Sequence, residues 1–214
     1  MIKIAKVYFR FGTMDSSKTA RLVMDAHEYT QKGEFVLPIK PVIDTRSKKG
    51  LIESRVGIST RCLDLEQDYN IYNHVKDLKL NQGIEVSCVL IDEAQFLTMA
   101  QVIQLRLVAD NLDIPVMCYG LKSDFRGNLF AGSKALFEYA NRFEEIKTTC
   151  RVEGCKKKAM FNVRYDKNGN PTFSGEQVKL GDTKQEDEGT EYYIVKCSSH
   201  FLADYVKFEE ENAK

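Results

Sequence analysis

The sequence has no excess of charge of either sign, since 31 lysine and arginine residues balance 31 aspartate and glutamate residues in a chain of 214. A protein that holds nucleic acid by neutralising many phosphates shows a basic excess, so this class is disfavoured, although a local basic pocket stays compatible with the balance. Glycine and proline are scarce, at 13 and 4 residues. This scarcity excludes a collagen-like or low-complexity chain.

Long apolar runs are absent as well. We find no segment long enough to span a bilayer, and residues 1–7 lack the apolar stretch and cleavage site of a signal peptide. We therefore expect a cytoplasmic protein that binds neither membrane nor nucleic acid. In the reducing cytosol the six cysteines are poor candidates for disulfides. Cys88 and Cys118 lie in apolar runs and are expected to be buried as small hydrophobic side chains.

What is present is an ordinary globular composition, 43% hydrophobic and 29% charged. Hydrophobic periodicity predicts alternating strands and helices over residues 1–149, which indicates an α/β layer fold with a parallel sheet. Strands are expected at residues 2–11, 35–39, 86–91, 114–119 and 145–149. Helices are expected at residues 18–31, 69–80, 98–111 and 134–143, the third with Thr98 as its cap.

The character of the sequence changes at Cys150. Residues 42–60, within the first part of the chain, are loop-rich and basic. Residues 151–196 are polar and rich in glycine and lysine, with short β-like runs at 159–163 and 192–195. A final helix is expected over residues 201–211. We therefore predict two domains, residues 1–149 and residues 150–214.

A turn rich in small polar residues follows the first expected strand. Gly12-x4-Ser17-Lys18-Thr19 nearly matches the phosphate-binding motif G-x-x-x-x-G-K-[ST], with Ser17 in place of the second glycine. In that motif backbone N–H groups bind phosphate at a helix N-terminus, the lysine reaches the terminal phosphates and the hydroxyl binds Mg²⁺. If φ is positive at Ser17, serine costs on the order of 1 kcal/mol. The alternative is a polar capping turn followed by a solvated lysine. The candidate phosphate-binding residues are Gly12, Thr13, Met14, Asp15, Ser16, Ser17, Lys18 and Thr19.

A pair of carboxylates follows the apolar run Val86–Ile91, which suits a strand buried on both faces. Residues at the C-terminal end of such a strand point into the ligand crevice of an open α/β sheet. Asp92 is there placed to hold Mg²⁺ through water, and Glu93 is placed to act as a general base. The alternative is a pair of solvated carboxylates at a strand end.

Four potential metal ligands occur as two close pairs, Cys150-x4-Cys155 and Cys197-x2-His200. Two such pairs suit the tetrahedral coordination of zinc. Because all four ligands come from the protein, this zinc is expected to be structural, and it would supply much of the folding free energy of a small module. The alternative is a set of free thiols and a surface histidine.

In the order and spacing of its segments, the sequence resembles the cytosolic, zinc-containing type of the thymidine kinase family, and the bacterial members most. The resemblance runs from Val7 to about Tyr205. It rests on Gly12–Met14 with Lys18–Thr19, Ile43–Arg46, Ser54–Gly57, Asp92–Leu97, Asp113–Gly127, Gly175–Val178 and Cys197–His200.

The resemblance implies a RecA-like ATP-binding core (residues 1–149) and a small zinc domain with a lasso loop over the nucleoside (residues 150–214). It implies transfer of the γ-phosphoryl group of ATP to the 5′-hydroxyl of thymidine, with Mg²⁺, a structural Zn²⁺ and a homotetramer. By the same resemblance Glu93 is the general base, Lys18 neutralises the transferred charge, and Thr19 and Asp92 serve Mg²⁺. The implied phosphate contacts are Arg46 and Arg55, with Asp44 in the same segment. The implied nucleoside-binding residues are Met14, Phe96, Leu121, Phe125, Val178, Gly181 and Tyr193.

Two departures from the family fall on the phosphate-binding turn, because members usually have glycine at position 17 and no acid at position 15. An acidic stretch at residues 183–190 also falls in the lasso, which is typically shorter. The first alternative is therefore a degenerate homologue that binds nucleoside or nucleotide but transfers phosphate poorly. A second is a zinc module or P-loop ATPase acting on nucleic acid. A third is a kinase that prefers deoxyuridine or another deoxynucleoside.

Overall fold

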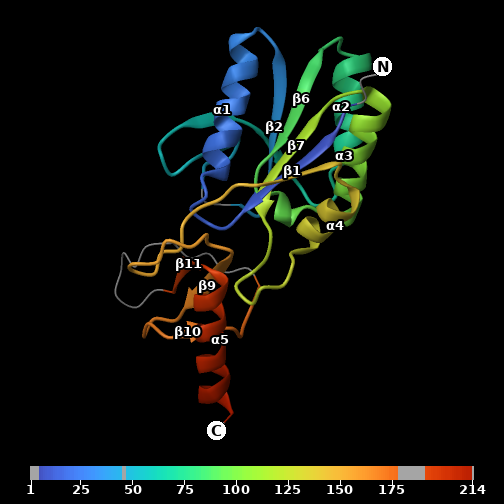
Figure 1. The fold of residues 1–214 in the computed structure, drawn as a ribbon. Coiled ribbons are helices and arrows are strands. Elements are labelled where there is room, and N and C mark those ends of the chain that lie inside the picture. Colours follow the sequence, from blue (N-terminus) through green and yellow to red (C-terminus); the bar gives the residue numbers. More distant parts are fainter. Residues whose placement is uncertain (1–4, 45–46, 178–190, 214) are drawn as a thin grey trace. The chain divides into compact units, whose positions relative to one another are not determined.

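The computed structural model describes residues 5–44, 47–177 and 191–213 (Figure 1). These residues form two compact units, and each is described by itself. The first unit comprises the chain up to Phe11, Ser17–Leu121 and Phe130–Glu145. The second unit comprises Gly12–Ser16, Lys122–Leu129 and the chain from Ile146 onward. The predicted division into folding domains at residues 149 and 150 stays a prediction.

A six-stranded sheet forms the centre of the first unit and confirms the predicted α/β class. Its strands lie in the order β5 (Leu63–Leu65), β2 (Phe35–Pro41), β6 (Val86–Ile91), β7 (Val116–Leu121), β1 (Val7–Gly12) and β8 (Arg142–Glu145). The pairs β5–β2, β2–β6, β6–β7 and β1–β8 are all parallel. Five of the six residues of β6 are buried, as its continuous apolar run predicts for a strand covered on both faces.

Helices cover both faces of this sheet (Figure 1). Helix α1 (Lys18–Gln31) lies on one face, and α2 (Ile71–Leu80), α3 (Met99–Leu112) and α4 (Ala131–Tyr139) lie on the other. The predicted bounds of α1 are confirmed, and its buried Leu22, Val23 and Ala26 recur at helical spacing. Helix α3 begins with a capping box, in which Gln101 N donates to Thr98 Oγ1 at 3.2 Å and Thr98 N donates to Gln101 Oε1 at 3.1 Å.

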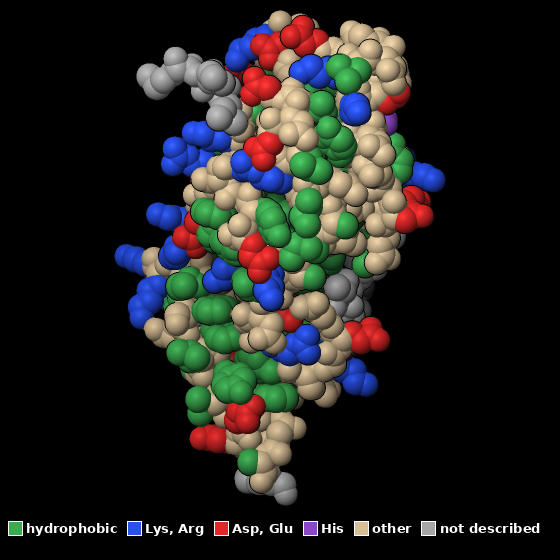
Figure 2. Space-filling view, turned by 90° about the vertical axis from the view of Figure 1, so that its right-hand side faces the viewer, with side chains coloured by type: hydrophobic (Ala, Val, Ile, Leu, Met, Phe, Trp, Pro, Cys, Tyr) green, Lys and Arg blue, Asp and Glu red, His purple; other side chains and the backbone are tan. Residues whose placement is uncertain are grey.

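The core of the first unit joins alternate strand residues, such as Phe9 and Val89, to helix residues such as Leu105. Cys118 belongs to this core, and Cys88 is also fully buried, which confirms the expectation for both thiols. Burial raises the pKa of the Cys88 thiol to about 12. Figure 2 views the molecule from the side of α2, α3 and α4, where apolar side chains lie among charged ones. None of the described helices is long and apolar enough to cross a membrane.

Two expectations for the first unit are wrong in detail. Helix α4 ends at Tyr139 instead of continuing to residue 143, and the strand expected at 145–149 is β8, Arg142–Glu145. The reason is a long-range contact, because Asn141 N donates to Val7 O at 2.8 Å and Asn141 Oδ1 accepts from Val7 N at 2.9 Å. The segment expected to be loop-rich, residues 42–60, overlaps the short antiparallel hairpin of β3 (Leu51–Glu53) and β4 (Ser59–Arg61).

The second unit contains a small antiparallel sheet and one helix. The strands lie in the order β10 (Pro171–Thr172), β9 (Phe161–Tyr165) and β11 (Tyr192–Lys196), and α5 (Ser198–Asn212) follows. One cluster of buried apolar side chains consists of Val163, Tyr165, Phe173 and Phe201, and Ile146 and Val195 of the same unit are buried as well. Phe201 stacks on Phe161 with ring centroids 4.1 Å apart.

Candidate functional site

The turn between β1 and α1 is built on strained backbone. Ser17, the residue before α1, has φ 61° and ψ 27°, and Asp15 has φ 57°. The positive φ expected to penalise serine at position 17 is therefore present, at a cost of about 1 kcal/mol or more. The first helical bond runs from Arg21 N to Ser17 O at 3.0 Å. Lys18 is 8% exposed, which contradicts the alternative of a solvated lysine after a capping turn.

Within the second unit, the residues of this turn are closely packed. A Cβ on Gly12 would lie 2.5 Å from both Ile146 O and Ser16 Oγ, so only glycine fits there. Ser16 Oγ donates to Thr13 O at 2.9 Å. Met14 N donates to Asn162 Oδ1 of β9 at 2.8 Å. Sequence reasoning missed Asn162, because a residue so distant in the chain carries no local signal for this contact.

The first unit brings together Thr19 and Asp92, the two residues expected to serve Mg²⁺. Thr19 Oγ1 donates to Asp92 Oδ1 at 3.3 Å, and Asp92 N donates to Ile39 O at 2.9 Å. Asp92 and Glu93 are 3% and 7% exposed, which contradicts the alternative of two solvated carboxylates. A hydroxyl and a carboxylate are hard oxygen donors of the kind that suits Mg²⁺.

Glu93 is held by a glutamine that sequence reasoning did not single out. Gln95 lies in the short 3₁₀ helix η1 (Ala94–Phe96) and is 2% exposed. Its Nε2 donates to Glu93 Oε2 at 2.5 Å, and its Oε1 accepts from Leu121 N at 2.9 Å. Glu93 itself adopts a left-handed conformation, with φ 47°. The carboxylate is thus oriented by a side chain anchored to the end of β7. The only signal in the sequence was the run Asp92–Leu97.

The segment after β2 holds the other predicted phosphate-binding residues. Asp44 is buried at 8% exposure and donates its N–H to Pro41 O at 3.0 Å, whereas Arg55 is exposed in the turn between β3 and β4. Arg46 lies outside the described residues.

Cys62 also lies in this part of the chain. Burial and the Asp64 carboxylate raise the pKa of its thiol to about 11, which disfavours a reactive thiolate.

Of the predicted nucleoside-binding residues, Phe96 and Leu121 lie in the first unit and are half-buried. The Phe96 ring meets Phe130 edge to face, with centroids 5.9 Å apart. Met14, Phe125 and Tyr193 lie in the second unit, where Phe125 and Tyr193 are 2% and 7% exposed. Val178 and Gly181 lie outside the described residues.

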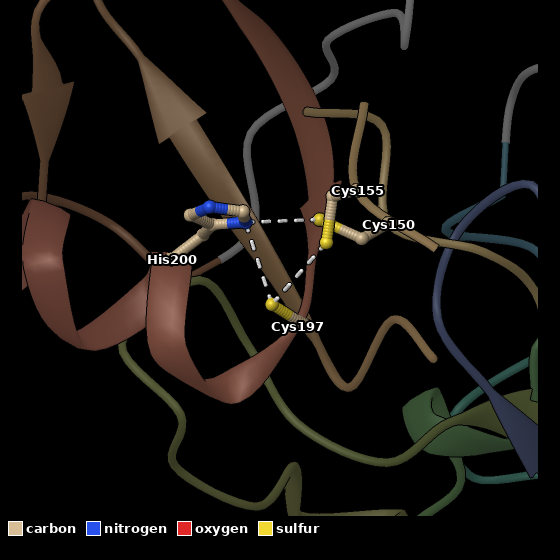
Figure 3. A group of neighbouring side chains, drawn as sticks. All are labelled: Cys150, Cys155, Cys197 and His200. Atoms are coloured by element: carbon tan, nitrogen blue, oxygen red, sulfur yellow. Dashed lines mark hydrogen bonds between the residues drawn. The ribbon is translucent and has the colours of Figure 1, made fainter. Parts of the chain in front are cut away.

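The predicted zinc ligands converge in the second unit (Figure 3). The ligand atoms of Cys150, Cys155, Cys197 and His200 all lie within 4.8 Å of one another. His200 Nδ1 lies 3.4 Å from the Sγ atoms of both Cys150 and Cys197, and the Sγ atoms of Cys155 and Cys197 are 4.0 Å apart. Tetrahedral coordination with bonds of about 2.0–2.3 Å separates ligands by roughly 3.5–3.8 Å. The four residues therefore fit a zinc ion.

Local structure explains how these ligands are presented. Cys150 and Cys155 flank a tight turn, with Cys155 N donating to Val152 O at 3.0 Å and Gly154 at φ +72°. Cys197 precedes the first residue of α5, and His200 lies in its first turn. His200 is half-buried and two of the thiols beside it are fully buried, so the histidine is not the surface residue that the alternative of free thiols and a surface histidine expects.

Comparison with known proteins agrees with the pattern of motifs. The family model described as "Thymidine kinase" matches residues 5–201. The chain is 40% identical over 199 residues to a thymidine kinase of Streptococcus gordonii, covering 93% of this chain and 97% of that one. It is 41% identical to thymidine kinases of Legionella pneumophila (92% and 90% covered) and Shouchella clausii (92% and 97% covered).

Likeness to one solved structure, the Pif1 helicase from Candida albicans, is weaker. The alignment with this helicase covers 67% of this chain and 36% of the helicase chain, with 17% sequence identity and a TM-score of 0.39. That score is too low to support an argument.

Proposed function

The chain belongs to the thymidine kinase family, and we propose that it transfers the γ-phosphoryl group of ATP to the 5′-hydroxyl of thymidine, giving thymidine 5′-monophosphate and ADP. The observation that carries the proposal is the family match over residues 5–201, which includes every described residue of the predicted site. We expect deoxyuridine to be a weaker substrate.

Phosphoryl transfer needs positioning and charge stabilisation more than covalent chemistry from the protein. Backbone N–H groups of residues 12–19, at the N-terminus of α1, are suited to bind the phosphates. Lys18 would neutralise charge on the transferred group, and Arg46 and Arg55 would add phosphate contacts. Thr19 and Asp92 would hold Mg²⁺, which when bound neutralises the phosphate oxygens. The contact between Thr19 and Asp92 at 3.3 Å supports this pairing.

Glu93 is proposed as the general base. As the 5′-oxygen forms its bond to the γ-phosphorus, its proton passes to a Glu93 carboxylate oxygen. The bond between the γ-phosphorus and the β–γ bridging oxygen breaks, and ADP leaves with the electron pair. The bond from Gln95 to one carboxylate oxygen supports this role, because it leaves the orientation of the other oxygen defined.

The remaining roles rest on the family. Phe96, Leu121, Met14, Phe125, Tyr193, Val178 and Gly181 are proposed to bind the nucleoside. Cys150, Cys155, Cys197 and His200 are proposed to hold a structural zinc, which the ligand distances support. We also propose a homotetramer acting in the cytoplasm, from family resemblance alone.

The test is ATP-dependent phosphorylation of a panel of deoxynucleosides by purified, zinc-replete protein. Robust turnover of thymidine, with deoxyuridine second and purine nucleosides silent, supports the proposal. No turnover of any nucleoside, while thymidine or ATP still binds, contradicts it and favours the degenerate homologue. A preference for a different deoxynucleoside contradicts the assigned substrate only.

A further inference from the structure

A fully buried arginine lies at the centre of the second unit and has no part in the proposed chemistry. Arg164 occupies the fourth position of β9 and is 4% exposed. Burying a charge is costly unless the group is paired and hydrogen-bonded, so its partners indicate what the protein gains from it.

The guanidinium of Arg164 binds the chain that leads away from β10. Its Nη1 donates to Glu176 O at 3.1 Å, and its Nη2 donates to Ser174 O. Between these two carbonyls lies Gly175, at φ +98°, where an added Cβ would come within 2.8 Å of Arg164 Nη2. The backbone of residues 174–176 therefore lies directly against the guanidinium, and its glycine is required by both conformation and space.

The same guanidinium also meets an acid and an aromatic ring. Arg164 Nε lies 3.8 Å from Glu191 Oε2, across β9 from the start of β11. Its Cζ lies 3.8 Å from the centroid of the Phe125 ring, a close cation–π stacking. Phe125 is 2% exposed, so this contact is desolvated, where such interactions are strongest.

A second buried charge ties the same two segments together. Asp124, 2% exposed, accepts from Arg126 N and Asn128 N, both at 2.9 Å, within its own turn. It also accepts from Gln177 Nε2 at 3.1 Å. Residues 122–129 are therefore linked to residues 174–177 by Asp124, and both are linked to β9 by Arg164.

We propose that Arg164 is a positioning residue for nucleoside binding, whose guanidinium links the Phe125 ring to the backbone of residues 174–176. This inference rests on the proposed role of Phe125 in the nucleoside site. A lysine cannot replace it, because a point charge offers neither a planar face for the ring nor a fixed pair of donors for two carbonyls. The arginine acts through Phe125 and is not itself a catalytic residue.

The same small sheet provides a matched control. Lys196 is also buried, at 7% exposed, and pairs with Asp204 at 2.6 Å and with Tyr165, which links β11 to α5. None of the contacts that the structure describes for Lys196 involves Phe125 or residues 174–177. Lys196→Met thus removes a buried cation of the same unit without touching the proposed positioning contact.

The experiment compares Arg164→Met, Arg164→Lys, Lys196→Met and Phe125→Leu in zinc-replete enzyme. KM and kcat for thymidine and ATP are measured, with zinc content and thermal unfolding as checks of folding. For Arg164→Met we expect KM for thymidine to rise about tenfold or more, with KM for ATP within about twofold of the wild type. Arg164→Lys should recover at most part of this loss. Lys196→Met should lower the unfolding temperature while KM for thymidine stays within about twofold of wild type.

Two outcomes overturn the inference: an unchanged KM for thymidine in folded Arg164→Met, or an equal rise in Lys196→Met, which would show a purely structural effect. If Arg164→Met does not fold, KM for thymidine in Arg164→Lys is compared with that in Lys196→Met instead. An unchanged KM in Phe125→Leu would overturn the proposed nucleoside site itself. A raised KM in Phe125→Leu with none in the Arg164 variants overturns only the positioning role.

Discussion

Residues of the candidate active site carry unusual backbone conformations. Asp15, Ser17 and Glu93 all have φ near +50° to +60°, at 57°, 61° and 47°. For residues with a Cβ this region costs roughly 1–2 kcal/mol each, and such strain persists where surrounding contacts determine the conformation. Two of these residues lie in the proposed phosphate-binding turn and the third is the proposed base. The strained backbone therefore coincides with positions that the proposed function uses.

Replacing Ser17 with glycine should relieve one of these strains. We expect Ser17→Gly to leave the unfolding temperature unchanged or to raise it, because the relief of about 1 kcal/mol offsets the greater entropy of glycine in the unfolded chain. Activity should be retained or increased. The neighbouring Ser16→Gly is the control, since Ser16 lacks a positive φ and its hydroxyl donates to Thr13 O. The unfolding temperatures of both variants are measured. An equal fall of the unfolding temperature in both would contradict the strain argument.

The proposed base is tested by Glu93→Gln. This change keeps the shape and removes the proton acceptor, so kcat should fall by about 100-fold or more while thymidine still binds. Glu85→Gln, at an exposed carboxylate just before β6, is the matched control and should keep full activity. Steady-state kinetics and calorimetric thymidine binding provide the measurements. A wild-type kcat in Glu93→Gln would remove Glu93 as the base.

At the scale of elements, η1 packs closely against both α4 and β7. A Cβ on Gly132 of α4 would lie 2.6 Å from Ala94 O, and one on Gly120 of β7 would lie 2.8 Å from Gln95 Oε1. Gln95 then joins η1 to β7 through Leu121 N. Because backbone atoms cannot easily give way, this packing determines where Glu93 points.

The contact of Gln95 with Glu93 and β7 predicts a specific fall in kcat when Gln95 is replaced. Gln95→Met should lower kcat by about tenfold or more, because the Glu93 carboxylate loses its fixed orientation, with KM for ATP little changed. Gln104→Met is the matched control, since Gln104 Oε1 likewise accepts from a backbone donor, Ile71 N, at 2.9 Å. Both variants should lose some stability, but only Gln95→Met should lose turnover. Equal kcat values in the two variants would refute the orienting role.

At the scale of the whole molecule, the two units differ in what stabilises them. The first has a large core between its sheet and three helices. The described part of the second unit has a cluster of four buried apolar residues, a few further buried ones such as Ile146 and Val195, and the four converging metal ligands. A small module of this kind can draw most of its folding free energy from a bound metal. The units should therefore respond differently to removal of zinc.

We expect about one zinc per chain in protein purified without chelator. Chelation, or Cys155→Ser, should abolish hydrogen-exchange protection in β9 and β11 while the strands of the first unit keep theirs. Cys62→Ser is the control and should retain the zinc, because Cys62 lies outside the cluster. Elemental analysis and hydrogen exchange provide the readouts. Absence of zinc from the purified protein, or uniform loss of protection in both units, would contradict this assignment.

Local sequence was informative wherever a single segment decides its own structure. The bounds of α1, the cap at Thr98 and the burial of β6 follow from periodicity and capping chemistry within a few residues. The end of α4 was misplaced because Asn141 binds Val7, a residue more than a hundred positions earlier. Periodicity carries no information on such a contact.

The sequence by itself determined the α/β class, and it predicted the phosphate-binding turn, the carboxylate pair and both halves of the candidate zinc cluster, because each is encoded in residues close together along the chain. Only the tertiary structure decided which distant side chains contact the residues of these sites. The hydrogen bond from Gln95 to Glu93 depends on the end of β7, and the bond from Met14 to Asn162 depends on β9. The stacking of Arg164 on Phe125 depends on β9 and on residues 122–129. Buried polar groups must find partners wherever the fold brings them, and that pairing is a property of packing in three dimensions.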